Sequence, residues 1–327
     1  MKLLTILVPD GAHNLSSVVG SFKILSRANE YQKNLGRSEI FKIQLAGVSK
    51  TVTLYDGLFT IRPHVHISDV RKTNLIIIPS LNHNFSESVA QNKKMANWIL
   101  QQHNRGAEVA SICTGAFLLA STGLLDGKSC STHWSAARRL GEMFPKVNWV
   151  NDHFITDEDG IYTNGGAFSF LNLLLYLIEK YYDRETAIYC AKVFQIDIDR
   201  NSQSQFTIFT GQKNHGDEVI KKAQGLIEKN INDKISIESL ATGFAVSRRN
   251  FDRRFIKATG NTPLEYLQRV KIEAAKKYLE TGRKTINEVM FDVGYSDVKA
   301  FRELFRRITG LSPLEYRNKY NREFVSN

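Results

Sequence analysis

The segment FDRRFIKATGNTPLEY at positions 251–266 recurs fifty residues later as FRELFRRITGLSPLEY at positions 301–316. Both copies keep two phenylalanines four residues apart, a Thr-Gly pair and the ending Pro-Leu-Glu-Tyr. Two copies at this spacing are too few and too far apart for a solenoid, which stacks at least about three repeats. The recurrence therefore predicts two copies of one helical module in the last third of the chain.

A short amphipathic segment and a tight turn precede each copy, in the order of a helix-turn-helix. In the first copy the apolar stripe contains Ile237, Leu240 and Ala241, and the turn runs from 243 to 246. Ser247 follows, where its hydroxyl can accept from the free N–H groups of the second helix.

The second copy has clearer helix signals. Residues 285–288, Thr-Ile-Asn-Glu, match a capping box, Gly294 supplies the turn, and Asp297 is predicted to cap the second helix. Each module then ends in a hydroxyl, a proline and a glutamate, which predicts a further helix. The first of these, Leu264–Glu280, would span about 26 Å. A connector of that length suits two recognition helices on major-groove faces roughly 34 Å apart.

The second helix of each copy is rich in cations on the face opposite its phenylalanines. A charged face is usually only solvated, but repetition in two helix-turn-helix frames favours contact with guanine edges and phosphates. The residues predicted to contact double-stranded DNA are Ser247, Arg248, Arg249, Asp252, Arg253, Lys257, Lys299, Arg302 and Arg306. Those nearest the helix starts are predicted to read bases, namely Arg249, Arg253, Lys299 and Arg302.

The net charge supports a polyanionic partner. The chain has 44 Lys and Arg against 33 Asp and Glu, a formal charge of +11. Residues 217–327 hold 22 basic and 15 acidic residues, so +7 of that excess lies in the last third. A basic domain of this kind is typical of nucleic-acid binding.

The preceding part of the chain alternates short apolar runs with helix-length segments. The runs are 3–8, 40–48, 75–78 and 108–112, and the main helical segments are 15–31, 86–103 and 135–143. This alternation predicts a flavodoxin-like parallel sheet with helices on both faces. A β-hairpin is expected over Val147–Thr163, followed by helices at 167–182 and 184–194. The expected domains are an α/β domain at 1–206 and an all-α domain at 217–320, joined by a linker at 207–216.

The three cysteines match neither a disulfide framework nor a zinc site. The predicted strand ending at Ile112 runs into Cys113-Thr-Gly-Ala, so Cys113 lies at a strand-to-helix turn. A helix start favours the thiolate, and Cys113 is therefore expected to react faster than Cys130 or Cys190 if the pocket admits solvent. His133 is the candidate partner, but no third residue is evident to orient it. The alternative is a buried, inert cysteine and a surface histidine.

Two family resemblances cover nearly the whole chain. Residues 293–297, VGYSD, and 309–313, TGLSP, resemble the signature of the AraC/XylS family of bacterial transcription regulators, with Met290 where that family usually has alanine. Residues 110–134, ASICTGAFLLASTGLLDGKSCSTHW, resemble the elbow of the ThiJ/PfpI branch of the class I glutamine amidotransferase-like superfamily, as found in GlxA-like regulators.

The second resemblance implies a pocket around the elbow. Its expected residues are Asp10, Cys113, Thr114, His133 and Trp134. Thr114 stands where peptidase-like members have histidine, and the loop 10–15 has no glutamate where many members place an acid. These departures imply a sensor that has kept an enzyme fold.

The resulting hypothesis is a cytoplasmic, ligand-responsive transcription regulator that is not an enzyme. Its expected partners are DNA, a small-molecule effector, a second copy in a homodimer, and RNA polymerase. No membrane, metal or cofactor is expected, and no stretch reaches the roughly 18 apolar residues of a membrane-spanning helix. Two alternatives stay open: a cysteine amidase or hydrolase that carries a DNA-binding domain, and a DNA-binding protein whose first domain only dimerises.

Overall fold

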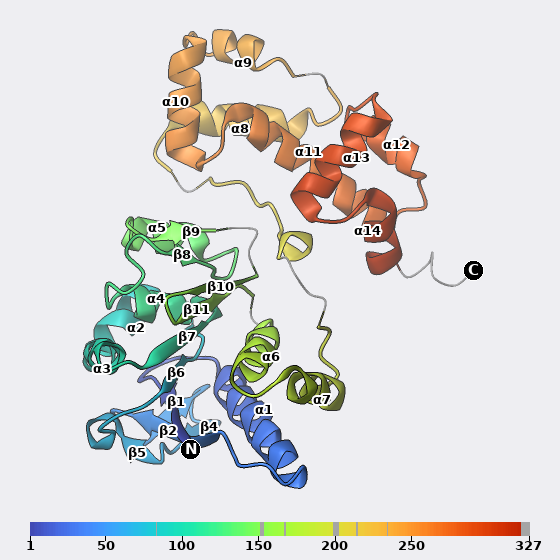
Figure 1. The fold of residues 1–327 in the computed structure, drawn as a ribbon. Helices are drawn as coiled ribbons and strands as arrows, with labels where there is room; N and C mark the ends of the chain where they lie inside the picture. The colour runs from blue at the N-terminus through green and yellow to red at the C-terminus, as the bar shows by residue number, and fades with distance from the viewer. Residues whose placement is uncertain are drawn as a thin grey trace. The chain divides into compact units, whose positions relative to one another are not determined.

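The computed structural model describes residues 1–82, 84–150, 154–166, 168–198, 203–213, 215–233 and 235–321. The chain divides into two compact units, Met1–Gln203 and Ser204–Asn327, which Figure 1 draws in blue to green and in yellow to red. The division falls just before the boundary expected after residue 206.

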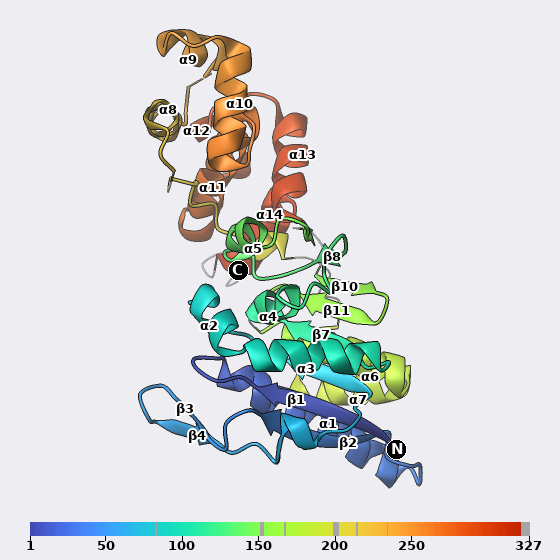
Figure 2. The ribbon, with the colours of Figure 1, turned by 90° about the vertical axis from the view of Figure 1, so that its left-hand side faces the viewer.

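Unit 1 is built on a seven-stranded sheet of order β10-β11-β7-β6-β1-β2-β5 (Figures 1 and 2). All neighbouring strands are parallel except the pair β10 and β11. The strands are β1 Lys2–Val8, β2 Phe41–Gly47, β5 Val65–His66, β6 Leu75–Ile78, β7 Glu108–Ile112, β10 Ile155–Glu158 and β11 Ile161–Asn164. Two smaller pairs are β3 Val52–Leu54 with β4 Phe59–Ile61, and β8 Ser129–Cys130 with β9 Asn148–Trp149.

Helices cover both faces of this sheet (Figure 2). One core lies under α1 Leu15–Asn34, α6 Phe170–Tyr181 and α7 Arg184–Phe194. The other lies under α2 Phe85–Gln91, α3 Lys93–Asn104, α4 Ala116–Ala120 and α5 Ala137–Met143. Successive strand residues point to opposite faces, so Leu4 and Ile6 of β1 enter the first core and Leu7 enters the second. The predicted α/β fold with helices on both faces is confirmed.

Strand β1 lies in the interior of the sheet, with β2 on one side and β6 on the other. The chain therefore changes direction across the sheet at the carboxyl ends of β1 and β6, the topological switch point where open α/β sheets bind ligands. The loops after these two strands are joined by hydrogen bonds from Asn14 N to Ser80 O at 2.8 Å and from Asn82 N to Ala12 O at 3.1 Å.

Two predicted elements differ in detail. The segment 86–103 forms two helices, because the side chain of buried Asn92 bonds the backbone of Asp10 between them. The predicted hairpin at 147–163 is the shorter pair β10–β11, while β9 pairs with β8. The remaining part of that prediction, residues 151–153, lies outside the described residues, as does Ala167 at the predicted start of α6.

Unit 2 is helical and contains two helix-turn-helix modules at the two ends of α11, as Figure 1 shows. The first module comprises α8 Glu218–Lys229, α9 Ile237–Gly243 and α10 Arg248–Thr259, and the second comprises α12 Ile286–Asp292, α13 Val298–Thr309 and α14 Pro313–Tyr320. The connector α11 runs from Pro263 to Thr281. These helices confirm the predicted tandem helix-turn-helix.

The repeated phenylalanines build one core in each module. Phe251 and Phe255 are fully buried in the first, and Phe301 and Phe305 in the second. Tyr266 and Tyr316, which end the two copies, pack edge-on against Phe255 and Phe305. Met290 fills the second core, as its flexible side chain allows.

The two turns differ although the modules repeat. Four residues, 244–247, separate α9 from α10, whereas five residues, 293–297, separate α12 from α13. The left-handed position is Gly294 in the second turn, with φ 72°, but Ala245 in the first, with φ 55°. Ser247 stands at the start of α10 but its side chain makes no capping bond, so that prediction is wrong. Asp297 accepts from the backbone of Lys299 and Ala300, as predicted.

The segment expected as a linker packs on unit 2. We call residues 204–213 the strap. Its Thr207 carbonyl accepts from Lys276 Nζ at 2.6 Å, and Phe209 N donates to Glu273 Oε2 at 3.1 Å, both on α11. Farther along, the Gln212 carbonyl accepts from Gln224 of α8 at 3.1 Å.

Candidate functional site

The first predicted DNA-contacting face lies on α10. Arg249, Arg253 and Lys257 are exposed and four residues apart, so they lie on one side of the helix, away from the two buried phenylalanines. Arg253 donates to Asn250 Oδ1 at 3.0 Å. Arg249 and Lys257 make no ion pair in the described part of the chain, which leaves both charges available to a ligand.

Two other predicted residues of α10 are paired with each other. Arg248 Nε lies 2.9 Å from both carboxylate oxygens of Asp252, and the Arg248 guanidinium is 3.7 Å from Glu238. Asp252 therefore neutralises a cation on this helix.

The second predicted face lies on α13 and is more strongly positive. Lys299, Arg302 and Arg306 are exposed and follow one side of the helix at i, i+3 and i+7. Within the described residues, none of the three is in an ion pair. Arg302 occupies the position that Asp252 has in the first copy, fifty residues earlier.

Two further arginines of these helices are bonded to other helices of unit 2. Arg254 forms a two-point ion pair with Asp217 at the start of α8. Arg307 donates to Gln268 of α11 at 3.0 Å. The sequence count of cations therefore overstates the charge that α10 presents, whereas exposed Arg307 keeps its charge beside the neutral amide of Gln268.

The elbow of unit 1 is formed as predicted. Cys113 has φ 53°, a left-handed conformation that is costly for a non-glycine residue, and it begins the short 3₁₀ turn η2 Cys113–Gly115. Its N–H donates to Asn164 Oδ1 at 3.1 Å, and its carbonyl accepts from Thr132 Oγ1 at 2.9 Å. At Gly115 a Cβ would lie 2.6 Å from the Pro79 carbonyl, so only glycine lets the elbow approach β6 so closely.

Burial works against the predicted activation of the thiol. Burial raises the pKa of Cys113, although the Ser80 hydroxyl and the N–H groups of Thr114 and Gly166 act in the opposite direction. Only 3% of Cys113 is exposed. The helix that follows, α4, has five residues and supplies a weak dipole. Desolvation of the thiolate therefore outweighs its stabilisation by the helix start.

The other predicted pocket residues have defined contacts. Thr114 Oγ1 donates to the Leu81 carbonyl at 2.6 Å and lies 2.7 Å from Ser80 Oγ. His133 Nδ1 lies 2.8 Å from Ser135 Oγ, and its ring lies against Trp134 with centroids 5.3 Å apart. Asp10 is held through its backbone by Asn92. The Cys113 thiol is hydrogen-bonded with Ser80 and Thr114. His133 in turn contacts Ser135 and Trp134.

One residue of this region escaped the sequence analysis. His13, in the loop after β1, is fully buried and forms an isolated bridge with Leu81 at the switch point. Its Nδ1 lies 3.2 Å from the Gly11 carbonyl and must donate, which makes Nε2 an acceptor in the neutral ring. Nε2 has no hydrogen-bond partner among the described residues. Burial lowers the pKa of His13, which keeps the ring neutral at pH 7.

Neither a metal centre nor a membrane span emerges from the described ranges. No three His, Cys, Asp or Glu side chains gather there in a way that could hold a metal ion. No described helix combines the length and the apolar character needed to cross a bilayer.

The fold and these sites define a class of protein: an α/β unit with a cysteine elbow, joined to a tandem helix-turn-helix unit. Residues 6–180 match the DJ-1/PfpI family, and residues 240–319 match a helix-turn-helix domain. The chain belongs to the DJ-1/PfpI family, with a C-terminal domain of the AraC type.

Similar proteins include two regulators. The chain is 26% identical over 226 residues to the HTH-type transcriptional regulator GbdR of Pseudomonas aeruginosa, covering 69% of this chain and 61% of that protein. It is 27% identical over 223 residues to the HTH-type transcriptional regulator GlxA of Rhizobium meliloti, covering 65% and 66%. The matches thus span about three fifths to two thirds of these relatives' length.

Solved structures share the fold of unit 1. A transcriptional regulator protein from Vibrio parahaemolyticus superposes with a TM-score of 0.53 at 22% identity, covering 59% of this chain and 98% of that one. A ThiJ/PfpI family protein from Pseudomonas syringae gives a TM-score of 0.51 at 17% identity, covering 75% and 90%.

Proposed function

We propose that this protein is a sequence-specific, DNA-binding transcription regulator whose unit 1 senses a small metabolite. The observation that carries the proposal is the pair of exposed cation rows, Arg249, Arg253 and Lys257 on α10 and Lys299, Arg302 and Arg306 on α13. Both rows lie on the second helix of a helix-turn-helix, the helix that enters the major groove in this motif.

The 19-residue connector α11 supports a two-site interaction, because its length of about 28 Å approaches one turn of DNA. In this proposal Ser247, Arg248 and Asp252 contact DNA beside the two rows. Arg248 and Asp252 contribute less than the rows because they neutralise each other.

DNA binding by the full chain tests this proposal. Fluorescence anisotropy with a selected duplex should show affinity that falls steeply with salt, since phosphate contacts release counterions. Arg302→Ala should weaken the preferred site by about 1–3 kcal/mol and random duplex by less. The matched control is Lys277→Ala, an exposed cation of α11 outside both rows. A flat salt response, or equal effects of the two variants, would reject the proposal.

We further propose that the effector binds at the switch point and elbow, near Asp10, Cys113, Thr114, His133 and Trp134, with His13 as an added recognition residue. The acceptor His13 Nε2 supports this location, because a buried polar atom without a partner costs free energy that a ligand donor would recover. Differential scanning fluorimetry against a metabolite collection tests it. A hit should raise the midpoint of the full chain, and His13→Phe should abolish that shift.

The elbow favours sensing over catalysis in this proposal. The thiol has a raised pKa, and Thr114 is bonded to Leu81 and Ser80 where an active hydrolase would need a base. The proposal also takes the protein as a cytoplasmic homodimer that contacts RNA polymerase. Sedimentation equilibrium of the full chain tests the dimer.

A further inference from the structure

One edge of the unit 1 sheet is only partly covered. Strand β5 pairs with Ala46 and Gly47 alone, at the carboxyl end of β2. The first five residues of β2, Phe41–Leu45, therefore have a strand neighbour only on the β1 side.

The backbone groups on this open edge belong to alternate residues. Lys2 N donates to Ile40 O, so even-numbered residues face β1, and Phe41, Ile43 and Leu45 face outward. Leu45 is satisfied by His64, whose N donates to Leu45 O and whose Nδ1 accepts from Leu45 N, both at 2.9 Å. The backbone N–H and C=O of Phe41 are both hydrogen-bonded to the side chain of Asn29. Among the described residues, nothing pairs with the N–H and C=O of Ile43 between them.

The Asn29 side chain shows which functional group can bind the free backbone groups of this edge. Its Nδ2 donates to Phe41 O at 2.5 Å, and its Oδ1 accepts from Phe41 N at 3.3 Å, so one primary carboxamide bridges both groups of one residue. The Tyr182 hydroxyl fixes this amide by donating to Oδ1 at 2.6 Å. A second carboxamide in the same orientation would bridge the equivalent groups of Ile43.

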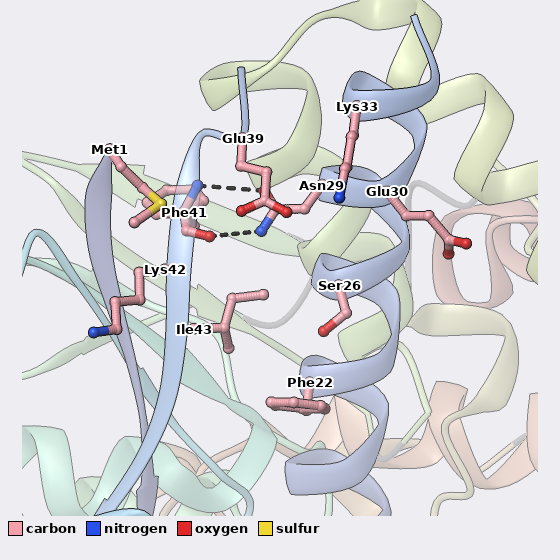
Figure 3. Close-up of a pocket in the computed structure, with 10 residues that line it drawn as sticks. All are labelled: Met1, Phe22, Ser26, Asn29, Glu30, Lys33, Glu39, Phe41, Lys42 and Ile43. Carbon is pink, nitrogen blue, oxygen red and sulfur yellow. Dashed lines mark hydrogen bonds between the residues drawn. The ribbon is translucent and has the colours of Figure 1, made fainter. Parts of the chain in front are cut away.

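A groove of about 510 Å³ lies between α1 and β2 along this edge; we call it the edge groove. Figure 3 shows Phe22, Ser26, Asn29 and Lys33 along one side of α1, facing Ile43 and Phe41. Phe22 and Ile43 make its lower part apolar, while Lys33 and Glu39 lie at its upper part near Asn29. Lys42 extends away from α1.

The charges at the upper part suit a zwitterion. Within the described residues neither Lys33 nor Glu39 is in an ion pair, whereas Glu30 is paired with Arg27 at 3.0 Å. Ile43 lies two residues from Phe41, a rise of about 6.6 Å. A five-carbon amino acid bound at Ile43 extends toward the level of Phe41, and Lys33 and Glu39 lie near Asn29 at that end of the groove in Figure 3.

We propose that the edge groove binds an amino acid whose side chain ends in a primary carboxamide. The carboxamide bridges the N–H and C=O of Ile43, the carboxylate faces Lys33, and the ammonium faces Glu39. This site lies at the amino ends of β1 and β2, away from the elbow, and does not depend on the proposed DNA binding.

Isothermal titration of the full chain with L-glutamine tests the proposal, with L-glutamate as the matched ligand. L-Glutamate should bind at least 10-fold more weakly, because its side-chain carboxylate has no hydrogen to donate to Ile43 O. Ile43→Pro removes the outward N–H without removing a ladder bond to β1 and should abolish the heat of binding. No heat with L-glutamine at 10 mM, or equal binding of the two ligands, would overturn the proposal.

A charge-matched pair of variants tests the site if the proline variant does not fold. Lys33→Gln should weaken L-glutamine binding at least 10-fold. Lys42→Gln, which changes an exposed lysine whose side chain extends away from α1 (Figure 3), should leave the affinity within twofold. Equal effects of the two would show that L-glutamine does not occupy the groove as proposed.

Discussion

The guanidinium of Arg254 on α10 holds the carboxylate of Asp217, with Nε and Oδ2 2.8 Å apart and Nη2 and Oδ1 2.6 Å apart. Asp217 also caps α8 by accepting from Ile220 N. The pair therefore fixes the start of α8 against the recognition helix. It explains why Arg254, although on a basic helix, is part of the scaffold and not of the cation row.

The first prediction concerns the pH dependence of this pair. The Arg254 hydrogen bonds lower the pKa of Asp217, so its contribution is present above the ordinary value near 4 and is lost as pH falls through the lowered folded value. Asp217→Asn keeps a capping residue but removes the charge. We expect the variant to lose about 1 kcal/mol of unfolding free energy at pH 7 and progressively less as the pH falls toward 2, measured by urea unfolding followed by circular dichroism. An equal loss of unfolding free energy in Asp217→Asn at both pH values would contradict the assignment of this stabilisation to the charged Asp217 carboxylate.

The second prediction concerns the two turns. Ala245→Gly should stabilise the protein by about 1 kcal/mol, because glycine adopts the left-handed conformation without strain. Gly294→Ala should destabilise it, since the added Cβ would also lie 2.6 Å from the Asn232 carbonyl. Scanning calorimetry measures both. A loss of stability in Ala245→Gly would refute the interpretation that Ala245 is strained in the left-handed conformation that Gly294 adopts in the second turn.

The third prediction concerns the strap. Lys276 is 4% exposed and bonds both the Thr207 carbonyl and Glu273, so Lys276→Met should cost about 3 kcal/mol by leaving the largely buried carboxylate without a cation. Lys277→Met, the exposed neighbour, is the control. Hydrogen exchange should accelerate at 204–213 and in α11 only in the first variant. Tryptophan fluorescence would miss this change because all three tryptophans lie in unit 1.

The fourth prediction concerns the cysteines. Burial raises the pKa of Cys113, raises that of Cys130 to about 12 and raises that of Cys190 to about 11. Iodoacetamide should therefore label all three slowly in the native chain at pH 7, and all three rapidly in urea. Cys113→Ala should leave amide and peptide hydrolysis unchanged. Rapid native labelling of Cys113 together with loss of turnover in this variant would support the hydrolase alternative.

Sequence patterns were sufficient where neighbours along the chain determine the structure. The i, i+4 phenylalanines, the capping box at 285–288 and the Thr-Pro and Ser-Pro helix starts act within one or two turns of backbone, and the helices form where they predict. The elbow at Cys113 follows equally from a buried strand that runs directly into a helix-forming segment.

The amino-acid sequence by itself determined the two helix-turn-helix modules, the α/β sheet and the cysteine elbow, because periodicity, caps and turn residues are local. Only the tertiary structure decided which charges are free, which groups are buried and which edge is open. Arg254 is withdrawn from the cation row by Asp217, 37 residues away, and the Cys113 thiol is desolvated by its burial in a core that distant strands and helices build together. Desolvation and pairing depend on distances in space, and those are set by the order of strands and helices rather than by spacing along the chain.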